Sequence, residues 1–208
     1  MGKIAGYTYL LDLDEAPAAS SATYGLSLSG KHPLNDEWSV KYYGEYAYQE
    51  EYGDNTTNYG TDYYHIAPAV VWKDVTATLG YEVMGSDNGA IGFSTPLATL
   101  HKFNGWADKF LTTPAKGLED LYVDIAYIIR GIKGWLEFLN DTEFKFQYHN
   151  FSAEEGSSDY GDEIGVSFNM PIGKHYYIEA RYADYDADSF ATDTQKFMVI
   201  IKDFAQVL

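Results

Sequence analysis

Apolar and polar residues alternate along most of the chain, in segments about as long as a β-strand. In residues 38–48, Trp38, Val40 and Tyr42 fall on one face and Ser39 and Lys41 on the other, because successive side chains of a strand point to opposite faces. This alternation holds for about ten residues, the length that a tilted strand needs to cross a bilayer. Similar segments lie at residues 5–13, 23–29, 64–72, 75–83, 121–130, 144–149, 164–169 and 176–183.

Two segments depart from the simple pattern. Residues 196–202 are mostly apolar on both faces but still have the length of a strand, and Pro68 interrupts the segment 64–72. Because proline cannot donate a ladder hydrogen bond, it predicts a bulge or a local bend there. With these segments included, we expect about ten strands, an even number as in bacterial single-chain barrels.

The connections between the segments are alternately short and long. Residues 32–37, 73–74 and 172–174 form tight turns, whereas residues 49–62, 85–120, 151–162 and 184–194 are long and polar or glycine-rich. Short turns on one side and long loops on the other are typical of an outer-membrane β-barrel. Residues 131–141 are the exception, since they are long, fall on the turn side, and suit an interfacial turn or short helix.

Composition supports this class. Aromatic residues make up 17% of the 208-residue chain, and no run of about 18 apolar residues could span a bilayer as a helix. Tyrosine-rich strands of modest hydropathy fit a barrel, because only every second residue faces lipid. The sequence therefore predicts an all-β fold, an antiparallel up-and-down transmembrane β-barrel in one domain, residues 1–208, with the partly helical external loop 85–120 between the fifth and sixth strands. A soluble β-sandwich would show the same alternation.

Charge and cysteine content exclude several other classes. The formal net charge is -17, so no basic surface is available for nucleic acid. The chain has no cysteine, which excludes a disulfide scaffold and any thiolate chemistry. Residues 1–3 lead straight into a strand pattern, so no signal sequence is visible, and we expect an exported protein to be in its mature or recombinant form.

The long loop 85–120 contains large apolar residues at helical spacing: Leu97, Leu100, Phe103, Trp106 and Phe110. We expect a short amphipathic helix that either folds into the barrel mouth as a constriction or caps the rim. If it forms a constriction, the residues near a passing solute are His101, Lys102, Trp106, Asp108 and Lys109.

The predicted inward positions carry charges of both signs. They are Lys41, Glu45, Glu82, Asp124, Lys145, His149, Glu179 and Arg181. These residues would line a pore and create a transverse field, or they would form an ion-pair network that satisfies charge inside a narrow barrel. The acidic residues of the long connections, Glu50, Glu51, Asp54, Glu154, Glu155, Asp159, Asp162 and Glu163, are expected to be solvated loop surface.

Four sequence blocks resemble bacterial outer-membrane porins related to alginate-export channels, in their C-terminal half. Residues 80–84 read GYEVM, 93–110 read FSTPLATLHKFNGWADKF, 117–122 read GLEDLY and 182–187 read YADYDA. The resemblance implies a barrel in the bacterial outer membrane, in contact with lipid and lipopolysaccharide, that passes small solutes or ions without a cofactor. Members of that family are about twice as long, so we expect a fragment, a shortened form or one piece of an assembly. The solute and the oligomeric state stay open.

Alternative functions have weaker support. Asp184, Asp186 and Asp188 have the spacing of a calcium loop, but Ser189 and Gln195 replace the required glycine and glutamate, which leaves only a looser divalent-ion site. An outer-membrane protease of similar strand number would pair His149 with Asp184 or Asp186. A plugged, structural or engineered barrel without transport is the remaining alternative.

Overall fold

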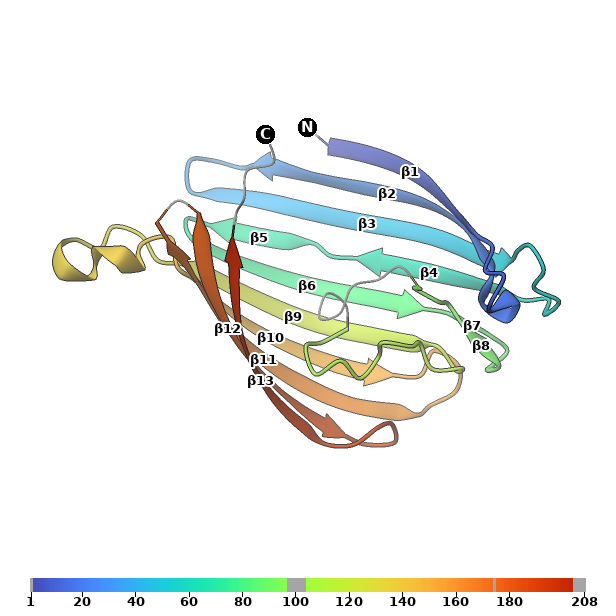
Figure 1. Cartoon of the computed structure of the whole chain (residues 1–208). Helices are drawn as coiled ribbons and strands as arrows, with labels where there is room; N and C mark the ends of the chain where they lie inside the picture. Colours follow the sequence, from blue (N-terminus) through green and yellow to red (C-terminus); the bar gives the residue numbers. More distant parts are fainter. Residues whose placement is uncertain (1, 97–103, 174, 204–208) are drawn as a thin grey trace.

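A computed structural model describes residues 2–96, 104–173 and 175–203, whose long strands form one curved antiparallel sheet (Figure 1). The strands run in the order β1-β2-β3-β4-β6-β9-β10-β11-β12-β13, with β5 beside β3 and β6. Their bounds are β1 Gly2–Leu11, β2 Ser21–Pro33, β3 Trp38–Glu51, β4 Gly60–Ile66, β5 Ala69–Trp72, β6 Val75–Met84, β9 Leu118–Ile128, β10 Glu143–Ser152, β11 Asp159–Ile172, β12 Tyr176–Ala187 and β13 Thr194–Asp203. All pairs are antiparallel, as the up-and-down prediction requires.

Strands β4 and β5 form one row of the sheet, since both pair with β3 on one side and β6 on the other. The row is interrupted at Ala67 and Pro68, where the Ala67 N–H still donates to the Tyr43 carbonyl over 2.9 Å and the Pro68 carbonyl accepts from Leu79 over 3.1 Å. The predicted irregularity at Pro68 is confirmed, and counting this row once gives the ten predicted rows.

The connections have the predicted asymmetry. Residues 34–37, 73–74 and 173–175 join strands at one end of the sheet, and residues 12–20, 52–59, 85–117, 153–158 and 188–193 join them at the other end. The first long connection contains a single turn of 3₁₀ helix, η1 (Pro17–Ala19). The exception at residues 131–141 is also real, since it holds a second 3₁₀ helix, η2 (Gly134–Leu139), which projects beyond the strand ends (Figure 1).

The two faces of the sheet differ in polarity. The strand register places alternate residues on the convex face, and its large side chains are exposed: Ile4, Leu26, Trp38, Tyr64, Ile66, Trp72, Leu79, Ile125, Phe146, Val166, Phe197 and Ile201. Trp38 and Trp72 stack on this face at the turn end, with ring centroids 5.9 Å apart. The opposite, concave face carries most of the polar and charged strand residues.

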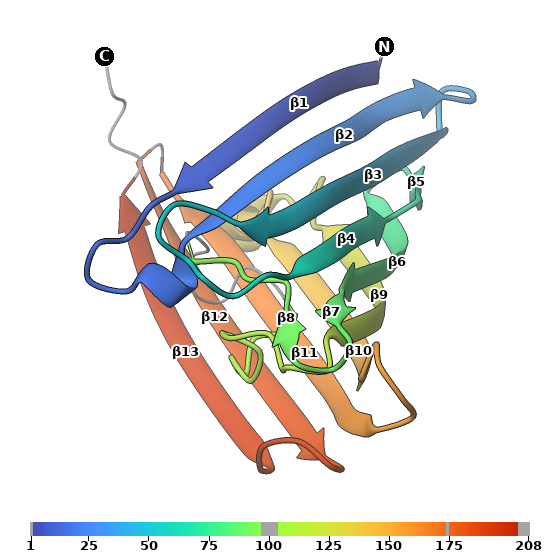
Figure 2. The same ribbon diagram turned by 90° about the vertical axis from the view of Figure 1, so that its right-hand side faces the viewer.

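Residues 104–117 of the connection from β6 to β9 lie against the concave face (Figure 2). The connection begins with a small hairpin, β7 (Ser86–Asp87) and β8 (Ile91–Gly92), and its Trp106 and Phe110 are buried together with Phe151 and Tyr185 of the sheet. The prediction of a helix is wrong for the part described, because residues 104–117 form bends and turns. The other expected helix positions, Leu97, Leu100 and Phe103, lie outside the described residues.

The sheet has two edges. Within the described ranges no hydrogen-bonded pairing joins β1 to β13, and the two strands end the row on opposite sides. In the same part of the chain, no helix has the length and apolar character needed to cross a membrane.

Candidate functional site

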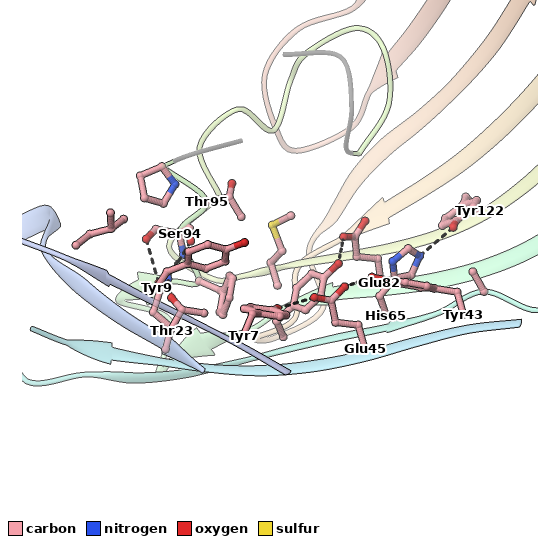
Figure 3. Close-up of a pocket in the computed structure, with 17 residues that line it drawn as sticks. Tyr7, Tyr9, Thr23, Tyr43, Glu45, His65, Glu82, Ser94, Thr95 and Tyr122 are labelled. Atoms are coloured by element: carbon pink, nitrogen blue, oxygen red, sulfur yellow. Dashed lines mark hydrogen bonds between the residues drawn. The ribbon is translucent and has the colours of Figure 1, made fainter. Parts of the chain in front are cut away.

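The concave face over β1 to β6 contains a cavity of about 740 Å³. Five tyrosines and one phenylalanine line it, with two carboxylates among them (Figure 3). The lining residues come from β1, β2, β3, β4, β6 and β9 and from residues 93–96 of the β8–β9 connection, which cover one end. They include Tyr7, Tyr9, Tyr43, Glu45, Gln49, Tyr63, His65, Glu82, Phe93 and Tyr122.

Tyrosine hydroxyls hold both carboxylates of the cavity in place. The Tyr7 hydroxyl donates to Glu45 over 2.5 Å and the Tyr43 hydroxyl donates to the other oxygen of the same side chain. The Tyr63 hydroxyl donates to Glu82 over 2.5 Å. A carboxylate away from bulk water needs such donors, so these carboxylates are fixed parts of the wall.

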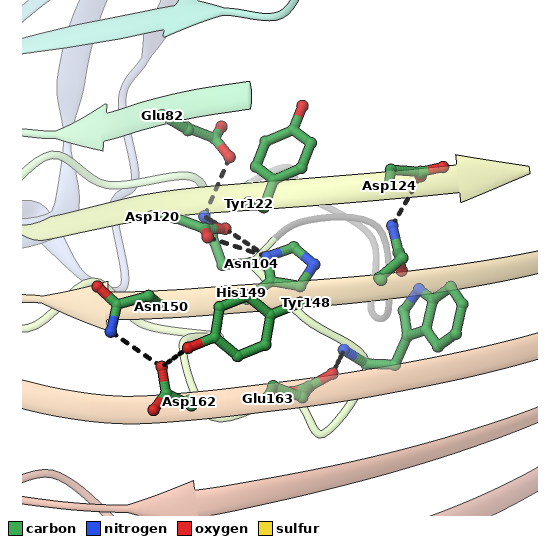
Figure 4. Close-up of polar contacts among 12 residues, drawn as sticks. Glu82, Asn104, Asp120, Tyr122, Asp124, Tyr148, His149, Asn150, Asp162 and Glu163 are labelled. Carbon is green, nitrogen blue, oxygen red and sulfur yellow. Dashed lines mark hydrogen bonds and ion pairs between the residues drawn. The ribbon is translucent and has the colours of Figure 1, made fainter. Parts of the chain in front are cut away.

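The other half of the concave face is covered by residues 104–110. Glu163 of β11 accepts hydrogen bonds from the backbone N–H groups of Trp106 at 2.5 Å and Ala107 at 3.1 Å. Glu163 pairs with His149 across β10 and β11, and both are labelled in Figure 4. Gly105 has φ +83°, and a Cβ there would lie 2.4 Å from the Glu163 carboxylate. Glycine is therefore required for this close approach. Asn104 adds hydrogen bonds from its amide to Glu82 at 3.0 Å and Asp120 at 3.4 Å.

Asp120 and His149 form a buried pair beneath this segment. The His149 Nδ1 atom lies 2.9 Å from both oxygens of Asp120, and its ring stacks between Tyr122 and Phe151. Asp184 lies on the opposite face, where it accepts a hydrogen bond from Tyr182. The structure therefore does not bring together the His149–Asp184 or His149–Asp186 couple that the protease hypothesis requires.

The register places all eight predicted pore-lining residues on the concave face: Lys41, Glu45, Glu82, Asp124, Lys145, His149, Glu179 and Arg181. Several form ion pairs there. Lys145 lies 3.0 Å from Asp124, Arg181 contacts Glu179, and Lys202 lies 3.6 Å from Glu179. These contacts support the ion-pair network over an unpaired transverse field, and whether the residues line a pore stays a prediction.

The predicted constriction residues have different positions. Trp106 is buried beneath the Arg181 guanidinium, 5.1 Å from the ring centroid. Asp108 pairs with Lys196 of β13, and the Lys109 ammonium lies 5.6 Å from the Tyr185 ring. His101 and Lys102 lie outside the described residues.

Several acidic predictions need correction. Glu50 and Glu51 lie within β3, and Asp159 and Asp162 lie within β11, so these four are strand residues and not loop surface. Glu163 is 2% exposed and anchors a backbone segment, so it is not solvated loop surface. Asp184 and Asp186 lie within β12, not in a loop, because the strand continues to Ala187. Glu163 falls on the same strand face as Gly165 and Ser167, which were predicted to point inward, so its burial could have been predicted from the alternation. Nothing in the sequence predicts its backbone partners.

Glu154 is a further acidic residue with a structural contact. It follows β10 at the end of the sheet where the long connections lie. One of its oxygens accepts a hydrogen bond from the Ser86 N–H over 3.2 Å, which ties the β10–β11 connection to the β7–β8 hairpin. Partial burial raises the pKa of this carboxyl, and the Ser86 N–H partly opposes the shift.

Comparison with known proteins identifies the fold. No protein-family model and no curated protein sequence matches the chain. Solved structures do match. OccAB3 of Acinetobacter baumannii matches at a TM-score of 0.71 and 16% sequence identity, and the match covers 98% of this chain and 52% of that chain. The outer membrane protein OprD of Pseudomonas aeruginosa matches at a TM-score of 0.63 and 16% sequence identity, and the match covers 98% of this chain and 56% of that chain. OccAB2 of Acinetobacter baumannii matches at a TM-score of 0.64 and 15% sequence identity, and the match covers 97% of this chain and 51% of that chain. This chain therefore has the fold of an outer-membrane β-barrel protein and spans about half the length of these structures.

Proposed function

We propose that this chain forms a porin-like β-barrel of the bacterial outer membrane that lets small solutes or ions diffuse across it. The observation that carries the proposal is the opposite polarity of the two sheet faces. Large apolar side chains are exposed over the convex face, whereas charges, hydrogen-bonded carboxylates and a cavity of about 740 Å³ occupy the concave face. A soluble β-sandwich would bury the apolar face and expose the polar one.

The convex face fits a bilayer in detail. Side chains such as Ile66, at 60% exposed, and Phe197, at 69%, would be costly in water across so wide a surface. Tyr46, Tyr81 and Tyr148 lie near the ends of their strands toward the long connections and donate to nearby carboxylates. Aromatic residues with a polar tip suit the boundary between hydrocarbon and headgroups. We place the long connections outside the cell, where lipopolysaccharide forms the outer leaflet.

A barrel in lipid leaves no strand edge unpaired, because the hydrocarbon offers no hydrogen-bond partner. The edges of β1 and β13 must therefore be paired when the protein is in a membrane. Ten rows is an even number, so β1 and β13 run in opposite directions and can be joined through antiparallel pairing. The finer relation to alginate-export channels stays part of this proposal.

A plugged barrel is the second candidate, and the segment 104–110 favours it. Its buried Trp106, Ala107 and Phe110 fill the space over β10 to β12. The cavity over β1 to β6 is the space left for a solute. The two candidates therefore differ in whether that cavity continues through the barrel.

Planar-bilayer recording of the refolded 208-residue protein tests the proposal. Discrete current steps are expected from an open channel. A protein that needs detergent to stay monodisperse yet gives no current would be the plugged barrel, and a protein that is monodisperse in plain buffer would contradict the membrane assignment. Peptidase activity that is lost in Asp120→Asn would contradict the assignment of a non-enzymatic channel.

A further inference from the structure

Two tyrosine rings of the cavity, those of Tyr7 and Tyr122, lie against glycines of the sheet. A Cβ at Gly25 would lie 2.0 Å from the Tyr7 ring, and a Cβ at Gly80 would lie 2.0 Å from the Tyr122 ring. Each ring therefore covers a glycine of a neighbouring strand, and the Tyr122 ring also stacks on His149. Tyr9 extends this surface, with its ring centroid 5.3 Å from that of Tyr7. Flat apolar faces of this kind pack against a flat apolar surface of a ligand.

The polar groups of the cavity mostly accept hydrogen bonds. The hydroxyl protons of Tyr7, Tyr43 and Tyr63 are used by Glu45 and Glu82, which leaves hydroxyl and carboxylate oxygens as acceptors. Gln49 is committed to Thr23 and Ser94. The lining, as far as it is described, includes no lysine or arginine. The cavity therefore favours a solute rich in donors and disfavours an anion.

Three lysines lie on the concave face at its turn end, outside the lining of the cavity. Lys3, Lys31 and Lys41 point to the concave face at the turn end of β1, β2 and β3, and Lys31 lies directly opposite Lys41. Lys41 precedes Tyr43 by one inward position, about 7 Å along the strand. In the part of the chain that is described, none of the three has an ion-pair partner. Lys41 lies two inward positions, roughly 14 Å, from Glu45, which is more than a Debye length at physiological salt, so its field changes cation binding little. Both carboxylates already accept hydrogen bonds from neutral donors, Glu45 from Tyr7 and Tyr43 and Glu82 from Tyr63 and Asn104, which leaves fewer of their lone pairs for a cation.

We propose that this cavity is a binding site for a small neutral saccharide. The inference rests on the proposed channel function and assigns a solute class to it. A pyranose ring presents an apolar C–H face to the rings of Tyr7 and Tyr9, and its hydroxyls donate to the tyrosine and carboxylate oxygens. The volume of about 740 Å³ lies within the range of small-molecule sites and accommodates a mono- or disaccharide.

Binding is measured by saturation-transfer NMR on the refolded protein, in a zwitterionic detergent without a sugar headgroup. Sucrose, arginine and glutamate are the probes. We expect saturable binding of sucrose, and an increase of roughly fivefold or more in its Kd in Tyr9→Ala, which removes a stacking face but no hydrogen bond seen in the structure. Tyr24→Ala is the matched control, because Tyr24 is similarly exposed on the convex face of β2 and should leave the Kd unchanged.

Three outcomes overturn the proposal: saturable binding of arginine without sucrose, no binding of either, or an equal effect of the two tyrosine variants. Bilayer conductance is recorded separately on the same preparation. Sucrose binding without current would leave the site intact and contradict the channel, whereas current without sucrose binding would contradict only the site. The two proposals therefore fail independently.

Discussion

Gly80 shows how a single residue shapes the cavity wall. The Tyr122 ring occupies the space above Gly80, and from there its hydroxyl is 2.9 Å from His65 Nε2. A methyl group at this position would push the ring off the sheet and break that contact. We expect Gly80→Ala to lower the free energy of unfolding by about 1–3 kcal/mol, measured by urea titration of the refolded protein in vesicles.

Gly44 is the matched control for that substitution. It also lies in a central strand, but a Cβ there has no atom within 4 Å. Alanine at this position restricts the unfolded chain without a clash, so Gly44→Ala should be neutral or stabilise by up to about 1 kcal/mol. Equal losses in the two variants would show that the Tyr122 ring does not depend on Gly80.

A second residue-scale prediction concerns the turn at residues 73–74. The Lys73 ammonium lies 3.0 Å from Glu37 and lowers the pKa of that carboxyl below its ordinary value. Because the folded-state pKa is depressed, the stabilisation is present above the ordinary pKa of a glutamate and is lost as the pH falls through the folded value. NMR titration of Glu37 should show this depressed pKa, and Lys73→Gln should return it toward the ordinary range. An unchanged titration curve in Lys73→Gln would mean that the ion pair does not form in solution.

Among the connecting elements, the segment 104–110 depends most on one side chain. Glu163 binds two of its backbone N–H groups, and hydrogen bonds to a buried charged group contribute about 1.5–3 kcal/mol. We expect Glu163→Ala to cost about 2–3 kcal/mol of unfolding free energy and to increase the amplitude of current fluctuations in bilayer recordings, because the segment is released from the wall.

Asp162→Ala is the control for this substitution. Asp162 neighbours Glu163 in β11 but accepts its hydrogen bonds from Tyr148 and Asn150, outside the segment 104–110. It should leave the current fluctuations at the level of the unmodified protein. If both variants change the current fluctuations equally, the effect of Glu163→Ala does not come from release of the segment 104–110.

Elements built from local pattern could be predicted from the sequence, and those built from distant contacts could not. The period of two placed the strands and the inward position of Lys145 and Asp124, because alternation is a property of the strand itself. The spacing of Trp106 and Phe110 predicted a helix, yet these residues pack in turns against Phe151 and Tyr185. Burial against the sheet fixed this segment, and periodicity carries no information about such a partner.

The tyrosine cavity escaped prediction for a similar reason. Tyr7 and Tyr43 were visible as strand residues, but their shared contact with Glu45 depends on the register of three strands. Gly25 and Gly80 looked like ordinary small residues of an inward face. Only the stacking of a cross-strand ring on each glycine reveals a flat aromatic surface.

At the scale of the whole molecule, the net charge of -17 is distributed unevenly. Ion pairs offset charge on the concave face, but four of the five long connections, residues 12–20, 52–59, 153–158 and 188–193, contain acidic residues and no lysine or arginine. A channel with this mouth should prefer cations because the acidic rim concentrates them, and not because the cavity binds them.

Salt concentration separates these two origins of selectivity. The Debye length falls from about 30 Å at 0.01 M to about 3 Å at 1 M salt, so the field of an exposed rim is screened while contacts inside the barrel are screened much less. We expect the reversal potential under a fixed KCl gradient ratio to indicate a clear K⁺ preference at low salt that largely disappears at high salt. Neutralising Asp14 and Glu15 of the first long connection should weaken the low-salt preference, whereas neutralising Glu37 at the opposite end should change it little. A preference that persists at 1 M salt would locate the selecting charges inside the barrel, at Glu45 and Glu82.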